Sequence, residues 1–211
     1  MSSAPRAGTP GPADAVAPLA DALAGPGWGV APGFLAPPLV AALRTRIAAL
    51  DAAGGLRPAA VGVAGARAVR PEVRGDRLAW IDPDTPAERT LLERLEALRL
   101  GLNERLALGL FDLECHYAHY PSGGRYARHR DRSPRGAERV VSVVMYLNDA
   151  WRAADGGALV LYPPSGPVTV LPEGGTLVAF LSAELEHEVR ATLRDRLSVV
   201  GWYRRRTHVV R

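Results

Sequence analysis

Arg139-Val-Val-Ser-Val-Val-Met-Tyr-Leu147 is the stretch that decides the fold. It is rich in β-branched and aromatic residues, which favour a pleated, half-buried strand. Similar short runs surround it in the chain, at Phe111–Tyr120, Ala158–Tyr162, Val168–Leu171, Thr176–Leu181, His187–Ala191 and Leu197–Tyr203. Turns rich in Gly and Pro separate these runs. The pattern predicts a mainly β fold whose core is a jelly roll, that is, a double-stranded β-helix.

Two helices are expected ahead of this core. The first has apolar residues at helical spacing from Leu39 to Leu50 and ends at Gly54 and Gly55. The second begins with Thr85 as N-cap and Glu88 as its capping-box partner, continues with a leucine stripe, and is expected to close at Gly109. We therefore expect helices packed on the outside of the jelly roll.

The 211 residues are enough for one domain with a substantial core. Residues 1–26 are rich in Ala, Pro and Gly and are expected to form a disordered tail. The domain then spans residues 27–211, with helical support at about 35–109 and the jelly-roll core at about 110–206.

Composition argues against several classes of protein. The net charge of +4 comes from 26 arginines and no lysine, and these arginines are scattered among acidic residues. Since no long run of like charge exists, we expect no nucleic-acid partner. No apolar run is long enough to span a membrane. The single cysteine, Cys115, excludes an internal disulfide and suits a cytoplasmic location. The oligomeric state is left open.

One constellation carries chemistry. His129 and Asp131 alternate along a strand and can face the same ion, while His187 opens a later strand. Two imidazoles and one carboxylate form the facial triad that holds non-heme Fe(II) and leaves coordination positions open. The alternative is that these are ordinary core or surface residues. That alternative is preferred for the three other histidines, which are His116, His119 and His208.

Arg196 follows His187 by nine positions, where such a site needs a cation for a dicarboxylate co-substrate. Its planar guanidinium matches a carboxylate with two parallel hydrogen bonds. Ser198 shares its face of the strand and offers a second donor. Tyr146 could add a phenol hydrogen bond, although spacing alone equally allows a half-buried core aromatic. The co-substrate expected from these residues is 2-oxoglutarate.

Four stretches resemble one family. They are Val73-Arg-Gly-Asp76-Arg-Leu-Ala-Trp80-Ile-Asp82, Tyr120-Pro-Ser-Gly-Gly-Arg-Tyr126-Ala-Arg-His129-Arg-Asp131, Val144-Met-Tyr146-Leu-Asn148-Asp-Ala-Trp151, and His187-Glu-Val189 continued through Arg196 to Trp202. From about Trp28 to Arg204 the chain resembles the prolyl 4-hydroxylases among the 2-oxoglutarate oxygenases. Within them it is most similar to the oxygen-sensing HIF prolyl hydroxylase (EGL-nine-like) branch and its bacterial relatives.

The resemblance implies roles for individual residues. His129, Asp131 and His187 would bind iron, and Arg196 and Tyr146 would hold the C5 carboxylate of 2-oxoglutarate. Tyr120 would lie near iron and co-substrate, and Trp202 would form a wall of the pocket. The implied cofactor is Fe(II), with 2-oxoglutarate and O2 as co-substrates and ascorbate as a reductant. The implied activity is hydroxylation of a prolyl residue in a protein or peptide, with release of succinate and CO2.

A gating hypothesis concerns residues 70–86. We expect Asp76 to pair with Arg139 near the entrance and to hold this loop, which carries Trp80, over bound substrate. An ordinary surface loop is the alternative.

Other functions remain open from the sequence. The same chemistry could act on a free amino acid, a small metabolite or an alkylated nucleobase. The chain could also be a non-catalytic metal-binding jelly roll, or an oxygen-responsive regulator whose partner matters more than turnover.

Overall fold

The computed structural model describes residues 12–62, 68–131 and 137–206. Its α-helices are α1 (Pro12–Ala24), α2 (Pro37–Ala52) and α3 (Pro86–Leu106), and a short 3-10 turn, η1, spans Ala153–Asp155. The strands are β1 (Trp28–Ala31), β2 (Arg57–Pro58), β3 (Ala60–Val61), β4 (Ala68–Val69), β5 (Arg77–Trp80), β6 (Leu110–Tyr120), β7 (Tyr126–His129), β8 (Ala137–Tyr146), β9 (Leu159–Tyr162), β10 (Val168–Val170), β11 (Leu177–Leu181), β12 (Glu186–Val189) and β13 (Arg196–Arg206).

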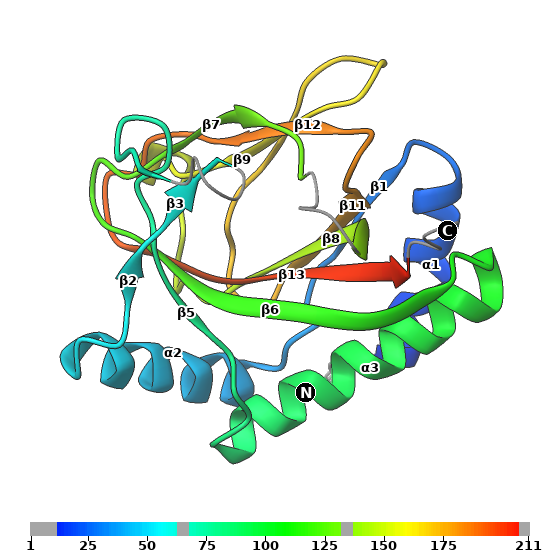
Figure 1. The fold of residues 1–211 in the computed structure, drawn as a ribbon, viewed down its shortest axis with the longest axis horizontal. Coiled ribbons are helices and arrows are strands. Elements are labelled where there is room, and N and C mark those ends of the chain that lie inside the picture. Colours follow the sequence, from blue (N-terminus) through cyan, green and yellow to red (C-terminus); the bar gives the residue numbers. More distant parts are fainter. Residues whose placement is uncertain (1–11, 63–67, 132–136, 207–211) are drawn as a thin grey trace, which may run out of the picture.

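Two antiparallel sheets form the jelly roll. The larger has the strand order β1-β11-β8-β13-β6-β5-β2, and the smaller has the order β10-β9-β12-β7. In Figure 1 the smaller sheet lies above the larger one, and α2 and α3 run beneath the larger sheet. The predicted mainly β fold with helices outside is therefore confirmed, and each of the seven predicted strands is present within three residues of its expected ends.

Alternation along β8 explains how one sheet serves two cores. Val141, Val143 and Met145 face the helices and join the larger apolar core. Val144 and Tyr146 face the smaller sheet and join a second core between the sheets. Since side chains alternate along a strand, the second face of the larger sheet is free to build an internal site.

The prediction for residues 1–26 is wrong over Pro12–Ala24, because this segment is helix α1. Leu19 and Leu23, one turn apart, are almost fully buried. The helix packs on α3, where a Cβ added to Gly101 would lie 2.6 Å from a methyl group of Val16. Alanine is a strong helix former, so the composition that suggested disorder also favours a small-residue helix when a partner is present.

The start of α3 is as predicted and its end is not. Thr85 and Glu88 form the reciprocal capping box. The helix stops at Leu106, and Ala107 rather than Gly109 takes the first left-handed conformation, with φ of 50°. Among the described residues, no helix is long and apolar enough to cross a membrane.

Candidate metal centre

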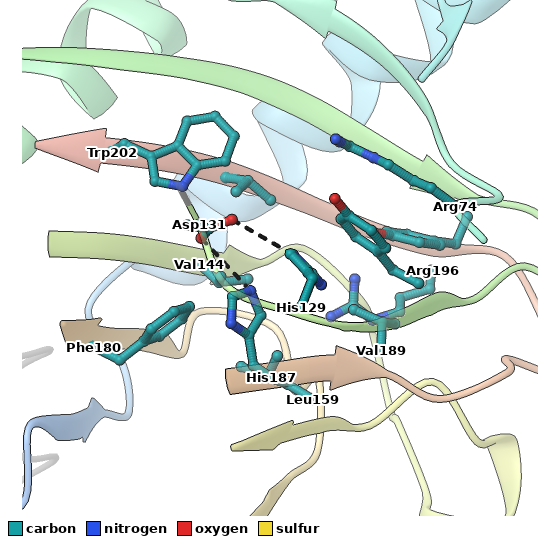
Figure 2. A pocket seen from close by; sticks show the side chains of 13 residues that line it. Arg74, His129, Asp131, Val144, Leu159, Phe180, His187, Val189, Arg196 and Trp202 are labelled. Atoms are coloured by element: carbon teal, nitrogen blue, oxygen red, sulfur yellow. Dashed lines mark ion pairs between the residues drawn. The ribbon is translucent and has the colours of Figure 1, made fainter. Parts of the chain in front are cut away.

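The two histidines of the predicted triad lie directly opposite each other on neighbouring strands. β12 pairs with β7 so that His187 faces His129, and Asp131 follows two residues after the end of β7. The Asp131 carboxylate oxygens lie 3.5 Å from His129 Nε2 and 3.6 Å from His187 Nε2. One ligand atom from each residue lies within 4.8 Å of the others. The sequence-predicted ligands therefore converge, as Figure 2 shows.

Backbone carbonyls orient both imidazoles. His129 Nδ1 lies 2.8 Å from the carbonyl of Ala127, and His187 Nδ1 lies 3.3 Å from the carbonyl of Leu185. A carbonyl only accepts, so each Nδ1 carries the hydrogen and each Nε2 keeps its lone pair for the ion. This is the outer hydrogen bond that metal-binding histidines usually make.

Electrostatics favour the protonation states that a divalent metal needs. Burial opposes ionisation of Asp131, but the His187 and His129 imidazoles outweigh it and hold the pKa of that carboxyl well below its usual range. Burial lowers the pKa of His187 to about 4. At neutral pH the site thus offers one carboxylate and a neutral His187 imidazole, a donor set that fits ferrous iron.

Arg196 lies at the start of β13, on the larger sheet, and is 1% exposed. Its Nε donates to the carbonyl of Gly157 at 2.8 Å, and its Nη1 donates to Ser198 Oγ at 3.3 Å. In the described part of the chain no acidic side chain pairs with this guanidinium. Since an unpaired buried charge is costly, the arrangement calls for an anionic ligand.

Two tyrosines flank Arg196. The Arg196 guanidinium carbon lies 5.2 Å from the ring centres of both Tyr120 and Tyr146. The Tyr146 hydroxyl is buried and has no hydrogen-bond partner among the described residues. Burial raises the pKa of Tyr146 to about 12 and that of Tyr120 further still, so both phenols stay protonated. A carboxylate beside Arg196 would satisfy both the charge and the orphaned hydroxyl, which fits the far end of 2-oxoglutarate.

The three metal ligands and Arg196 line one pocket. It is lined by Arg74, Tyr120, Tyr126, His129, Asp131, Val144, Leu159, Phe180, His187, Val189, Arg196, Val200 and Trp202. In the view of Figure 2 the three metal ligands lie between Trp202 and Phe180 on one side and Arg196 on the other. Tyr120 and Trp202, which the sequence resemblance placed near the site, are among the residues that line this pocket.

Arg74 and Tyr126 line the pocket but received no role from the sequence. The Tyr126 ring stacks on His129 at 3.6 Å between ring centres, and the Arg74 guanidinium lies 4.8 Å from the Tyr126 ring centre. Both residues stand in the family-like stretches. Since stacking across the two stretches depends on tertiary structure, sequence spacing could not reveal it.

The predicted pair of Asp76 with Arg139 is replaced by other pairs. Asp76 is buried and accepts two hydrogen bonds from Arg74, at 2.7 and 3.0 Å. Arg139 donates to Glu114 at 2.8 Å and lies 3.6 Å over the Trp202 ring centre. Arg74 is nearer in sequence to Asp76 and shares its burial, so it outcompetes the distant arginine.

The expected lid is partly a regular strand. Residues Arg77–Trp80 form β5, which is paired with β6 inside the larger sheet. Trp80 is 53% exposed, and its ring lies 5.2 Å from that of His116. Backbone pairing therefore holds residues 77–80 of the expected lid in the sheet.

The sequence analysis interpreted the other three histidines as ordinary core or surface residues. His116 is buried and stacks on Trp202, with 5.3 Å between ring centres. His119 Nδ1 contacts the guanidinium of Arg77 at 3.0 Å. His208 lies outside the described residues.

Comparison with known proteins agrees with this geometry. A family model described as the 2OG-Fe(II) oxygenase superfamily matches residues 115–204. Human prolyl hydroxylase EGLN3 is 30% identical over 170 residues, which cover 75% of this chain and 70% of that protein. Human Egl nine homolog 1 is 29% identical over 144 residues, covering 63% of this chain. The match spans only 33% of the length of that longer relative.

Solved structures give the same result. A Pseudomonas putida prolyl-4-hydroxylase is 45% identical with a TM-score of 0.83, covering 90% of this chain and 99% of that one. A Trichoplax adhaerens prolyl hydroxylase, in complex with a peptide of the hypoxia inducible factor oxygen degradation domain, is 28% identical with a TM-score of 0.82. The coverage there is 91% of this chain and 90% of that one. With its His-Asp-His cluster and buried arginine in place, the chain belongs to the 2OG-Fe(II) oxygenase superfamily and is homologous to its prolyl hydroxylases.

Proposed function

We propose that this protein hydroxylates a prolyl residue of a peptide or protein, using Fe(II), O2 and 2-oxoglutarate and releasing succinate and CO2. One observation carries the oxygenase chemistry. Arg196 lines the same pocket as the triad and is buried, with no acidic partner among the described residues, and it lies beside the Tyr146 hydroxyl, which has no hydrogen-bond partner there. The prolyl substrate is inferred from the relatives named as prolyl hydroxylases.

Iron, when bound, supplies oxygen activation and the oxidation of the substrate carbon. The chain's own residues hold and orient the reactants. His129, Asp131 and His187 would hold the ion, and a set of three protein ligands would leave coordination positions for the co-substrate. Arg196, with Ser198 and Tyr146 beside it, would hold the distal carboxylate by charge and hydrogen bonds.

Apolar side chains enclose the reaction. Val144, Leu159, Phe180 and Val189 line the pocket. Apolar side chains at these positions exclude water from the reacting atoms.

The test is succinate release from protein purified without oxygen and loaded with Fe(II). Candidate prolyl peptides should raise succinate formation and gain one oxygen atom by mass spectrometry. Matched peptides with alanine in place of proline should do neither. His129→Ala and Asp131→Ala serve as inactive controls. Succinate formed equally with both peptide sets would reject the prolyl substrate and leave the oxygenase chemistry standing.

A further inference from the structure

Ser142 is a polar residue in the middle of the valine-rich strand β8. It is fully buried, and its strand neighbours in register are Trp202 on β13 and Phe180 on β11. A hydroxyl between two large aromatic residues in a strand core is costly unless it makes hydrogen bonds. Its position on the Val144 and Tyr146 face of β8 directs it toward the metal centre.

The Ser142 hydroxyl makes two contacts. Its Oγ donates to Asp131 Oδ2 at 2.7 Å, and it lies 2.9 Å from the Oγ of Ser182, which is also fully buried. An ionised carboxylate can only accept, so the single hydrogen of Ser142 goes to Asp131. Ser182 must then be the donor to Ser142. The two hydroxyls form a directed chain that ends on the metal ligand, and such chains strengthen in apolar surroundings.

Asp131 depends on this chain more than the histidines do. Each imidazole is oriented by a carbonyl two residues earlier in its own segment. In the described chain Asp131 lies beside the two histidines, and the Trp202 indole also favours its ionised form. Ser142 is the residue outside the ligand set whose hydroxyl donates to the carboxylate at 2.7 Å. Asp131 lies beyond the end of β7, outside the ladder that holds His129.

We propose that Ser142, supported by Ser182, is a positioning residue that holds Asp131 Oδ2 and presents Oδ1 to the ion. The pair thereby sets the metal affinity of the site. It also keeps the carboxylate from chelating with both oxygens, which leaves coordination positions open for co-substrate and O2. This inference rests on the iron site alone and is independent of which substrate is hydroxylated.

Metal affinity can be measured without turnover, by titrating the metal-free protein with Mn(II) and following the free ion by electron paramagnetic resonance. Ser142→Ala should weaken Mn(II) binding roughly tenfold or more, the usual effect of losing an outer partner of a ligand. Ser182→Ala should weaken it less. Ser142→Thr keeps the hydroxyl on a β-branched residue suited to a strand and should bind like the parent protein.

Ser198→Ala is the matched control, because it removes another fully buried hydroxyl that contacts Arg196 and no metal ligand. It should leave the Mn(II) affinity unchanged. Thermal unfolding of each metal-free variant checks the fold. Parent-like Mn(II) affinity in a folded Ser142→Ala protein would overturn the proposal. If that variant does not fold, Ser182→Ala and Ser142→Thr decide, and parent-like affinity in Ser182→Ala would then overturn it.

Discussion

The Tyr146 hydroxyl is buried without a hydrogen-bond partner among the described residues, so a bound ligand would supply its partner. Tyr146→Phe removes a buried oxygen that has no partner among the described residues, so the metal-free protein should lose no stability and could gain about 1 kcal/mol. The same change should weaken 2-oxoglutarate binding roughly five- to tenfold, because one hydrogen bond to the carboxylate is lost. Thermal unfolding and calorimetric titration with Mn(II) and 2-oxoglutarate measure the two effects. Loss of stability without loss of affinity would show a purely structural hydroxyl.

Arg196→Lys tests the need for a planar fork at the same place. A lysine keeps the charge but cannot form two parallel hydrogen bonds to a carboxylate. The KM for 2-oxoglutarate should rise on the order of tenfold or more, since hydrogen bonds to charged groups contribute about 1.5–3 kcal/mol each. Mn(II) affinity should stay unchanged. A parent-like KM in the lysine variant would mean that charge alone suffices.

His116 makes the fold sensitive to acid. Burial lowers the pKa of His116 from 6.5 to about 4. The Arg74 and Arg139 charges also lower it, and the Asp76 charge opposes them. Between these values the unfolded chain binds a proton that the folded chain does not, so stability falls as pH falls from about 6.5 to 4. The loss from this one group is on the order of 3 kcal/mol. His116→Met should flatten the decline of the urea-unfolding free energy over that pH range; an unchanged decline would contradict the assignment.

At the scale of elements, the contact between α1 and α3 depends on a missing side chain. Gly101→Ala within α3 would ordinarily add up to about 1 kcal/mol of helix stability. Here the new Cβ would approach Val16 Cγ1 at 2.6 Å, so the variant should instead have a lower Tm. Adding Val16→Ala should recover the loss, which a double-mutant cycle by thermal unfolding would measure. A higher Tm for Gly101→Ala alone would argue against this close packing.

Elements with local physical causes were predictable from the sequence. The capping box of Thr85 and Glu88 needs only four residues, and the Val-rich run of β8 needs only its own composition. Helix α1 escaped prediction because its stability comes from packing on α3, which no local pattern reports. The same reason explains the pairing of Asp76, since the sequence shows which charges exist but not which of them share a buried environment.

At the scale of the molecule, the candidate site unites residues that the chain keeps far apart. The residue types of the triad and its spacing from Arg196 allowed these ligands to be predicted from the sequence. The contributions of Arg74, Tyr126 and Ser142 could not be predicted, because they depend on strand order and register.

The division of the pocket between two sheets has one further consequence. The histidine ligands stand on the smaller sheet and Arg196 on the larger, so the spacing of the sheets fixes the span between ion and guanidinium. We therefore expect a keto-diacid one methylene shorter, such as oxaloacetate, and one a methylene longer, such as 2-oxoadipate, to bind more weakly than 2-oxoglutarate. On this expectation, the distance between the two sheets makes the length of the co-substrate a determinant of its binding.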